Sequence, residues 1–235
     1  MVRETHHKSP ALRGESRSRA WHDEIKNQFH GANTQELFQI RRLRRSELPV
    51  NTVKLARFLI GKTLVHDSPK GRMSGRIVET EAYPIGDAAG HAFGGETPSR
   101  RSLFLERGRS YVYFTYGSCF MMNVSSEKAG IGAGVLLRAV EPLEGIALME
   151  NHRGTRRLVD LTRGPGRLAK AMDIDKRFDG VDLCAEGPLW LGAALRRTSA
   201  VGVSIRIGIT REVRQLYRFY ERRNPFVSGP KRLRS

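Results

Sequence analysis

Residues 76–83, Arg-Ile-Val-Glu-Thr-Glu-Ala-Tyr, constrain the fold of this chain more than any other stretch. Their Ile, Val, Thr and Tyr residues favour a β-strand, and Pro84 ends the strand because proline lacks the N–H that a sheet ladder uses. Side chains alternate between the two faces of a strand, so Glu79, Glu81 and Tyr83 share one face. Two interpretations of that face stay open. It is a solvated surface, or it places a carboxylate in a cleft as a general base beside an aromatic ring that holds a flat substrate.

The charge of the chain indicates a polyanionic partner. The 235 residues include 41 Lys and Arg against 24 Asp and Glu, which gives a formal net charge of +17. The excess is spread through the body: residues 153–177 hold eight basic and three acidic residues, and residues 205–235 hold nine and two. Nucleic acid is the usual partner of such a chain.

Cysteine and histidine usage argues against metal and disulfide chemistry. Cys119 and Cys184 stand far apart, and none of the seven His residues has the spacing of an H-E-x-x-H zinc site. We therefore expect no cofactor, no metal and a reducing compartment. The start of the chain is polar and charged, and the apolar runs are too short to span a bilayer, so no membrane partner is expected.

Composition predicts three segments. Residues 1–47 are basic and short of large apolar side chains, which is typical of a disordered arm, with one helical pattern near residues 35–45. Residues 48–228 are predicted to form one folded domain. Residues 229–235 form a short basic tail.

Strand patterns dominate the middle of the chain. The predicted elements are a helix capped at Asn51 or Thr52 and ended by Gly61, a strand at 63–66, a β-hairpin at 110–124 that turns near Tyr116 and Gly117, a strand at 135–140, a helix from Pro142 to Arg153, and strands at 203–209 and 217–220. We predict an α+β fold, a single domain with a curved, mostly antiparallel sheet, flanking helices and a protruding β-hairpin.

Two further features point to a site. Arg138 lies in an otherwise apolar strand, where it is either paired with an acid or placed at a functional site. Residues 163–171, which begin Arg-Gly-Pro-Gly-Arg, predict a loop that leads into a helix flanked by cations and suited to an anion.

Together these motifs resemble the alkyladenine (3-methyladenine) DNA glycosylase family over about residues 50–228. The residues that carry the resemblance are 59–62, 76–83, His91, 111–113 with 116–117, 122–126, 135–142, 163–168 and 206–209. The segment from Glu81 to His91 is one residue shorter than the family pattern. The resemblance implies that residues 48–228 are a glycosylase domain. It also implies a DNA repair enzyme that flips alkylated or deaminated purines out of duplex DNA and hydrolyses the N-glycosylic bond, leaving an abasic site.

The resemblance also implies roles for individual residues. Glu81 is the general base, Arg138 helps to hold the attacking water, and the backbone carbonyl of Ile207 completes that water site. The flipped base is contacted by Tyr83, His91, Tyr113 and Asn123. DNA is bound by Tyr116 and Gly117 on the hairpin and by Arg163, Gly164 and Arg167, with Tyr116 filling the gap that the flipped nucleotide leaves.

The expected partner is double-stranded DNA that contains damaged purines, bound by a monomer in the bacterial nucleoid or the eukaryotic nucleus. A non-catalytic nucleic-acid-binding module on the same fold is the alternative, but a pure binder gains nothing from the Glu81 carboxylate near a phosphate-rich ligand. A bifunctional lyase is a second alternative. It is disfavoured because neither the strand 76–83 nor the hairpin contains a Lys that could form a Schiff base.

Overall fold

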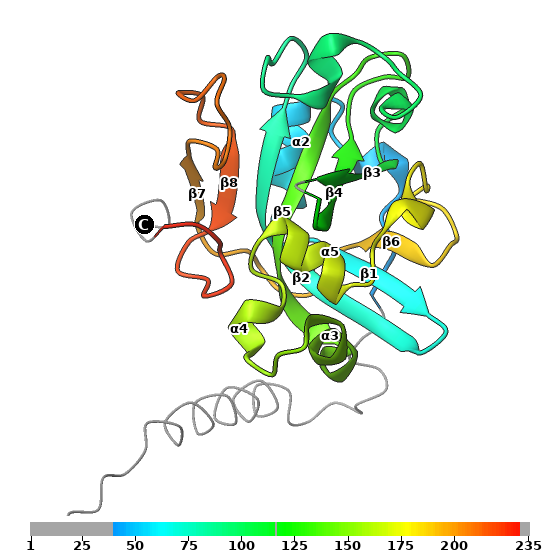
Figure 1. Ribbon diagram of the computed structural model, residues 1–235, viewed down its shortest axis with the longest axis vertical. Coiled ribbons are helices and arrows are strands. Elements are labelled where there is room, and N and C mark those ends of the chain that lie inside the picture. The colour runs from blue at the N-terminus through cyan, green and yellow to red at the C-terminus, as the bar shows by residue number, and fades with distance from the viewer. Residues whose placement is uncertain (1–39, 116, 231–235) are drawn as a thin grey trace, which may run out of the picture. The chain divides into compact units, whose positions relative to one another are not determined.

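The fold is built on a curled antiparallel sheet (Figure 1). The structure is a computed structural model that describes residues 40–115 and 117–230. Within these residues the sheet has eight strands: β1 (Thr63–Ser68), β2 (Gly71–Tyr83), β3 (Ser110–Thr115), β4 (Cys119–Ser125), β5 (Gly134–Glu144), β6 (Leu189–Gly192), β7 (Val201–Ser204) and β8 (Arg218–Glu221). The helices of the described residues are α2 (Thr52–Leu59), α3 (Ile146–Arg153), α4 (Leu158–Leu161) and α5 (Pro165–Ala171), with 3₁₀ turns at Arg45–Glu47, His91–Gly94, Arg101–Phe104 and Lys176–Phe178. The predicted α+β class with a mostly antiparallel sheet is confirmed.

Strand β2 is the centre of the sheet. The main path runs β3-β4-β5-β2-β1-β6, and every pairing along it is antiparallel. On the edge that faces away from β5, the first part of β2 pairs with β1, whereas Glu79–Glu81 pair with β8, which in turn pairs with β7. The sheet therefore branches at the position where the two glutamates lie.

The pairing of β2 with β5 is interrupted at the same position. The register skips Val78 on β2 and Arg138 on β5. Bulges of this kind bend a strand and re-aim a side chain, and they are common next to active sites. Here they bring Arg138 to the face of the sheet that carries Glu79 and Glu81.

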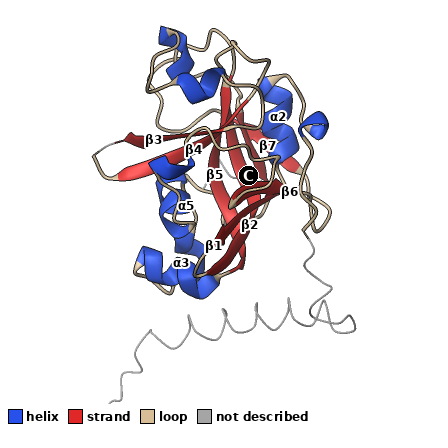
Figure 2. Cartoon of the chain, turned by 90° about the vertical axis from the view of Figure 1, so that its right-hand side faces the viewer, coloured by secondary structure: helices blue, strands red, loops and turns tan. Residues whose placement is uncertain are grey.

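Helix α2 covers one face of the sheet, and α3 and α5 lie on the other (Figure 2). The predicted cap of α2 is confirmed, because the Asn51 side chain accepts a hydrogen bond from a backbone N–H of the first turn. Leu55, Ala56 and Leu59 of this helix are fully buried in the core. Gly61 follows with φ +88°, a conformation that glycine adopts without strain.

The packed domain begins earlier than predicted. Residues 40–47, assigned to the arm from composition, lie against the edge strand β6: Leu43 is 1% exposed, and its N–H donates to the carbonyl of Leu191. The helix predicted over 35–45 is wrong for residues 40–44, which are extended, and its remainder lies outside the described residues. Composition missed this segment because its pairing partner lies about 150 residues away in the sequence. Residues 1–39 and 231–235, including most of the predicted arm and tail, also lie outside the described residues.

Two other element boundaries differ from the prediction. Strand β5 continues through Pro142 to Glu144, which pairs with Ser74, so α3 begins only at Ile146. Strand β7 ends at Ser204, well before the predicted end at residue 209.

The predicted hairpin of β3 and β4 is confirmed. Its ladder runs from the pair Ser110 and Val124 to the pair Thr115 and Cys119, and it projects from the body of the sheet (Figure 2). Gly117 in the connecting turn has φ +61°. Tyr116 lies outside the described residues. None of the helices within 40–230 has the length and apolar character needed to cross a membrane.

Candidate active site

A pocket of about 170 Å³ opens between the hairpin, the loop after β2 and the loop between β7 and β8. A cavity of about 150 Å³ is large enough to accept benzene, so this pocket has the size for a planar ring. All the residues predicted to hold the base or the water line it: Tyr83, His91, Tyr113, Asn123, Arg138 and Ile207. The shortened segment before His91 has not displaced that side chain from the pocket.

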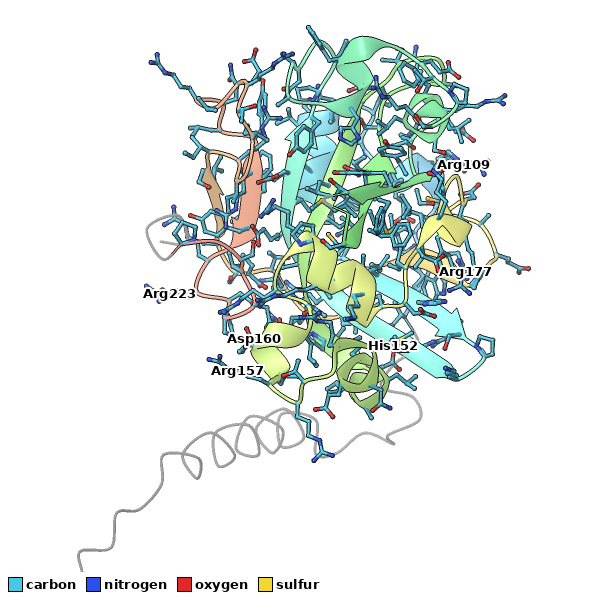
Figure 3. All side chains as sticks on the ribbon, in the orientation of Figure 1. Arg109, His152, Arg157, Asp160, Arg177 and Arg223 are labelled. Carbon is cyan, nitrogen blue, oxygen red and sulfur yellow. The ribbon has the colours of Figure 1, made fainter. Side chains whose placement is uncertain are left out.

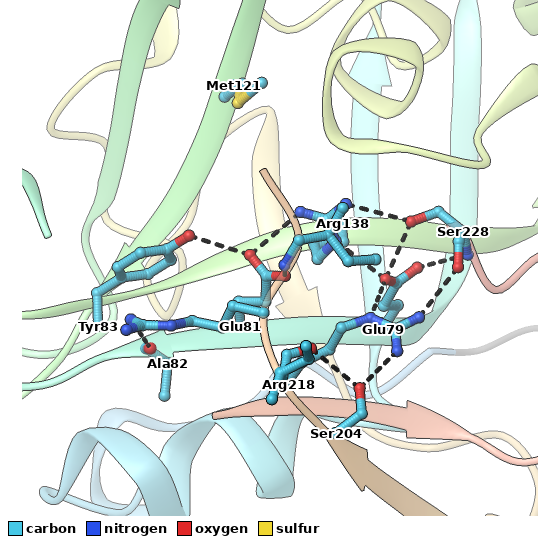
Figure 4. A network of polar contacts seen from close by, with 12 residues as sticks. Glu79, Glu81, Ala82, Tyr83, Met121, Arg138, Ser204, Arg218 and Ser228 are labelled. Carbon is cyan, nitrogen blue, oxygen red and sulfur yellow. Dashed lines mark hydrogen bonds and ion pairs between the residues drawn. The ribbon is translucent and has the colours of Figure 1, made fainter. Parts of the chain in front are cut away.

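Glu81 lies directly behind the pocket wall. Its side chain is fully buried, and it accepts three hydrogen bonds, from the Tyr83 hydroxyl at 3.0 Å, Arg138 Nη1 at 3.1 Å and the Ile207 N–H at 2.8 Å (Figure 4). All three donors belong to residues that line the pocket. The carboxylate therefore lies next to the pocket, and the solvated interpretation of this face is wrong.

Ile207 reaches Glu81 through its backbone N–H. This bond explains why β7 ends early, because the chain leaves the sheet after Ser204 and donates to the carboxylate of another strand. The predicted role of the Ile207 carbonyl at a water site stays a prediction.

Glu79 is held by a closed set of donors. Its carboxylate accepts from Arg138 Nε at 2.9 Å, Arg218 Nε at 2.7 Å, and Ser228 through both N–H at 2.6 Å and Oγ at 3.0 Å (Figure 4). Arg218 is itself fully buried. Glu79 is therefore a buried partner of the site residues and not a solvated carboxylate.

The two carboxylates differ in pKa. Burial raises the pKa of Glu81 above its ordinary value, and the Arg138 guanidinium and the Ile207 N–H oppose this shift without cancelling it. Burial would also raise the pKa of Glu79, but the guanidinium groups of Arg138 and Arg218 outweigh it, and the pKa is lowered. Environments that separate the pKa values of neighbouring acids are typical of active sites and point to the base. Glu81 has the higher proton affinity of the two.

Arg138 links the two glutamates. Burial alone would lower the pKa of its guanidinium, but the charges of Glu81 and Glu79 raise it, so the group stays charged. The ion pairs fix its position at the inner wall of the pocket. A fixed cation beside a carboxylate and an open pocket can hold a polar ligand such as water.

Three aromatic side chains form the opposite wall. The His91 and Tyr113 rings lie 4.3 Å apart at their centroids, and the Tyr113 ring stacks on Tyr111 at 5.2 Å. Burial, followed by the charge of Arg100, lowers the pKa of His91, which favours the neutral ring. His91 Nδ1 lies 3.0 Å from the Tyr111 hydroxyl. Tyr111 is buried, and it also lines the pocket and contacts His91. The sequence feature that could have placed Tyr111 at the pocket is its position two residues before Tyr113, on the same face of the strand.

Arg206 and Asp87 are two site residues that the sequence did not reveal. Arg206 forms a buried ion pair with Asp87 and donates to the Ala82 carbonyl at 3.0 Å. Its guanidinium carbon lies 4.6 Å from the centre of the Tyr83 ring. The pair is separated by 119 positions in the sequence, and no local pattern connects such residues. It joins the loop after β2 to the loop that carries Ile207.

Asn123 carries an unsatisfied donor. Its Nδ2 is buried and has no hydrogen-bond partner among residues 40–115 and 117–230, although the residue lines the pocket. An unmade hydrogen bond of a buried group costs about 1–3 kcal/mol. A ligand that offers an acceptor here would recover that energy.

Four of the residues predicted to bind DNA, Gly117, Arg163, Gly164 and Arg167, do not line this pocket. Arg163 and Arg167 flank the start of α5 and both form ion pairs with Asp160, while Gly164 precedes the helix with φ +127°. Gly117 lies in the hairpin turn. Their contact with DNA stays a prediction.

The part of the chain that the structure describes has no group of three or more His, Cys, Asp or Glu side chains placed to hold a metal ion. The expectation that no metal or cofactor takes part stays a prediction.

The buried Glu81 carboxylate beside a pocket lined by aromatic side chains is typical of an enzyme active site that binds a planar ring. A sequence model of the methylpurine-DNA glycosylase family matches residues 46–225, so the chain belongs to this family. A protein of Mesorhizobium japonicum is 60% identical over 189 residues, which cover 80% of this chain and 91% of the relative. Relatives from Paraburkholderia phytofirmans and Chlorobium phaeobacteroides are 55% and 42% identical, cover 81% and 77% of this chain, and are themselves covered to 90% and 92%. All three are named "Putative 3-methyladenine DNA glycosylase".

The protein is therefore a DNA glycosylase, a hydrolase of N-glycosyl compounds whose substrate is DNA. This result favours an enzyme over the alternative of a non-catalytic binding module.

Proposed function

We propose that the protein is a monofunctional DNA glycosylase that removes 3-methyladenine and related alkylated or deaminated purines from duplex DNA. It flips the damaged nucleotide into the pocket and hydrolyses the N-glycosylic bond with a water activated by Glu81, leaving an abasic site. It acts as a monomer wherever the DNA lies, in the nucleoid or the nucleus. The names of the relatives support 3-methyladenine as the damaged base, and the pocket lining supports hydrolysis of its N-glycosylic bond.

The environment of Glu81 is the observation that carries this proposal. The carboxylate is buried, its pKa is raised, and Tyr83, Arg138 and Ile207, which donate to it, all line the pocket. A base with raised proton affinity can take a proton from water as the oxygen attacks the sugar carbon. Before it takes that proton, the ionised carboxylate also stabilises the positive charge that develops on the sugar ring.

The aromatic lining suits the leaving group. Alkylation makes some purines cationic, and the face of a Tyr ring attracts a cation. Tyr113 and the neutral His91 ring offer such faces in the pocket. The Asn123 amide offers a hydrogen-bonding group to the purine edge and can reject bases whose edge does not match it.

Nucleotide flipping is needed because the Glu81 carboxylate is buried. A base inside a duplex cannot reach a buried carboxylate, and damaged pairs cost less to open. The hairpin turn carries Tyr116, which we assign as the wedge that fills the vacated space, with Gly117 beside it. Arg163, Gly164 and Arg167 are assigned to the DNA backbone.

The test is release of free base. Duplexes that each carry one lesion (3-methyladenine, hypoxanthine or an etheno adduct) are incubated with the protein in EDTA, and free base and strand breaks are followed. We expect base release without metal, and strand breaks only after alkali treatment of the abasic site. Strand cleavage without alkali would contradict a monofunctional enzyme, and no release from any duplex would reject the proposal.

A further inference from the structure

Arg206 and Asp87 form a buried ion pair that the proposed chemistry does not use. Both Nη atoms of Arg206 donate to the Asp87 carboxylate, Nη2 at 3.1 Å, and the two side chains are 0% and 2% exposed. Surface arginines such as Arg157 and Arg177 differ, because their side chains are 74% and 67% exposed (Figure 3). Taking two charges out of water is costly, so stability alone does not explain a pair at this position.

The guanidinium of Arg206 holds Tyr83 from two sides. It lies between two tyrosine rings, 4.6 Å from the centre of Tyr83 and 5.4 Å from that of Tyr217. Its Nη1 also donates to the carbonyl of Ala82 at 3.0 Å, and Ala82 lies beside Tyr83 in Figure 4. Arg206 therefore contacts both the ring of Tyr83 and the backbone just before it, and these contacts set the direction in which the ring points.

The same residue fixes the segment that carries Ile207. Ile207 follows Arg206 directly, and its N–H donates to Glu81 Oε1 at 2.8 Å. Strand β7 ends at Ser204, so its ladder with β8 does not extend to this segment. The Arg206–Asp87 pair supplies the missing tether, because it joins the segment to the loop after β2.

Two of the three donors to Glu81 thus depend on the Arg206–Asp87 pair. They are the Tyr83 hydroxyl, at 3.0 Å from Oε2, and the Ile207 N–H. Hydrogen bonds to a carboxylate favour its ionised form, and both of these bonds lower the pKa of Glu81 against the larger effect of burial. Loosening them would raise that pKa further.

The other charged groups around Glu81 are held from different strands. Arg138 of β5 donates to both Glu81 and Glu79. Arg218 of β8 pairs with Glu81 in the ladder but directs its Nε at Glu79. A change in the Arg206–Asp87 pair that conserves charge therefore reaches the Glu81 carboxylate through the tyrosine hydroxyl and the backbone N–H.

We propose that Arg206 is a positioning residue for the base. Held in its buried ion pair, it keeps the Tyr83 hydroxyl and the Ile207 N–H directed at the Glu81 carboxylate. The inference rests on the proposed function for the role of Glu81 as the base. Arginine suits this task because its planar group binds a carboxylate through two N–H donors and also stacks on aromatic rings, which lysine does not reproduce.

The first experiment titrates Glu81 itself in the wild type and in Arg206→Lys. The Glu side-chain carboxyl carbons are labelled with ¹³C, and the Glu81 resonance is identified by its absence from Glu81→Gln. Lys keeps the positive charge opposite Asp87, so charge alone predicts no change. We expect a higher pKa of Glu81 in Arg206→Lys, because its two hydrogen bonds are loosened. An unchanged pKa would overturn the proposal.

Arg76→Lys is the matched control. Arg76 forms a buried ion pair with Glu221 at 3.0 Å and donates to the Gly61 carbonyl at 2.8 Å, so it has the same kinds of partner. Neither member of this pair lines the pocket. We expect a comparable loss of stability in urea unfolding, with the pKa of Glu81 at its wild-type value. If both Lys variants move that pKa equally, the effect is general loosening of the sheet, and Arg206 is not a positioning residue.

The second experiment changes the other member of the pair and follows the rate. Asp87→Asn removes a negative charge near Glu81, so charge alone predicts that the acid limb of the single-turnover rate moves to lower pH. Loss of positioning predicts the opposite. We expect the limb to move up by about one pH unit, the size that follows when a hydrogen bond to a charged group is lost. A limb that stays in place or moves downward would reject the positioning role.

Failure of this inference is distinguishable from failure of the proposed function, because the titration of Glu81 does not depend on catalysis. If the pKa is unchanged in Arg206→Lys while Glu81→Gln loses base release, only the positioning role is wrong. If the pKa rises in Arg206→Lys while Glu81→Gln releases base at the wild-type rate, only the proposed chemistry is wrong.

Discussion

Glu79 and Glu81 lie two residues apart on one face of one strand, yet they occupy opposite kinds of environment. Glu79 is enclosed by donors from Arg218 and Ser228, which do not line the pocket, and from Arg138, which it shares with Glu81. Glu81 is bound by groups that also line the pocket. The surroundings of Glu79 stabilise its ionised form and link strands of the sheet. The surroundings of Glu81 leave its pKa raised beside a cavity. Burial alone therefore does not distinguish the base from its neighbour; the position of the partner residues, at the pocket or away from it, does.

The sharpest test of this comparison is Glu81→Gln. Gln keeps the shape but cannot take a proton from water, so we expect base release to fall by about 10²–10⁴-fold, the usual contribution of a general base. Lesion-DNA binding should be nearly intact. Single-turnover kinetics with enzyme in excess measure the rate, and near wild-type rates would show that Glu81 is not the base.

Glu79→Gln should give the reverse pattern. It leaves the buried guanidinium groups of Arg218 and Arg138 short of a counter-charge, which costs about 3–5 kcal/mol of stability when a buried pair is broken. The rate of base release by the fraction that remains folded should change much less than in Glu81→Gln. Urea unfolding and single-turnover kinetics on the same preparation measure both. Equal losses of rate in the two variants would mean that the comparison assigns the wrong carboxylate.

Tyr116→Ser extends the comparison beyond the pocket, because a wedge acts on the DNA and not on the water. Base–aromatic stacking is worth roughly 1–3 kcal/mol, so we expect the flipped complex to weaken by about that amount. A fluorescent base opposite or beside the lesion reports flipping, and thermal melting reports stability. A large drop in melting temperature with normal flipping would reject the wedge and indicate that the ring is part of the core.

The smallest expected effect is a shift in the pH profile. Glu81 must be ionised to act, and its pKa is raised, so the rate should fall with acid at a pH above that of an ordinary Glu. The charge of Glu79 contributes to that raised pKa. In Glu79→Gln the acid limb of the single-turnover rate should therefore move to lower pH. A limb that stays in place or moves upward would show that Glu79 does not influence the base.

Local patterns predicted much of this molecule. The α2 cap, strand β2 and the hairpin follow from neighbouring residues, and the placement of Glu79, Glu81 and Tyr83 on one face follows from strand alternation. Pocket residues such as His91 and Asn123 came from the family resemblance and not from spacing.

What the sequence could not supply is the long-range bonding. The partners of Glu79 come from Arg218 and Ser228, 139 and 149 positions away, and those of Glu81 include Ile207 at 126. The alternation of side chains treats the two glutamates alike, so nothing local could show which one is saturated. Residues 40–47 were misassigned for the same reason, since their apolar content is small and their partner strand is distant.

The β2–β5 ladder is interrupted three times. One interruption lies at Ser74 and Gly75, and the two at the site, at Val78 and Arg138, cancel each other. Ile77 pairs with Val140 before them and Thr80 with Leu137 after them, so the strands regain the register in which they entered. The site thus adds one unpaired residue to each strand, Val78 to β2 and Arg138 to β5. This arrangement predicts which deletions the two strands tolerate. Deleting Arg138 alone would shift the rest of β5 by one position and exchange the side chains of its two buried faces. Deleting Val78 as well would remove both bulges at the site and keep the two strands in register across it, in a sheet that lacks the Arg138 side chain.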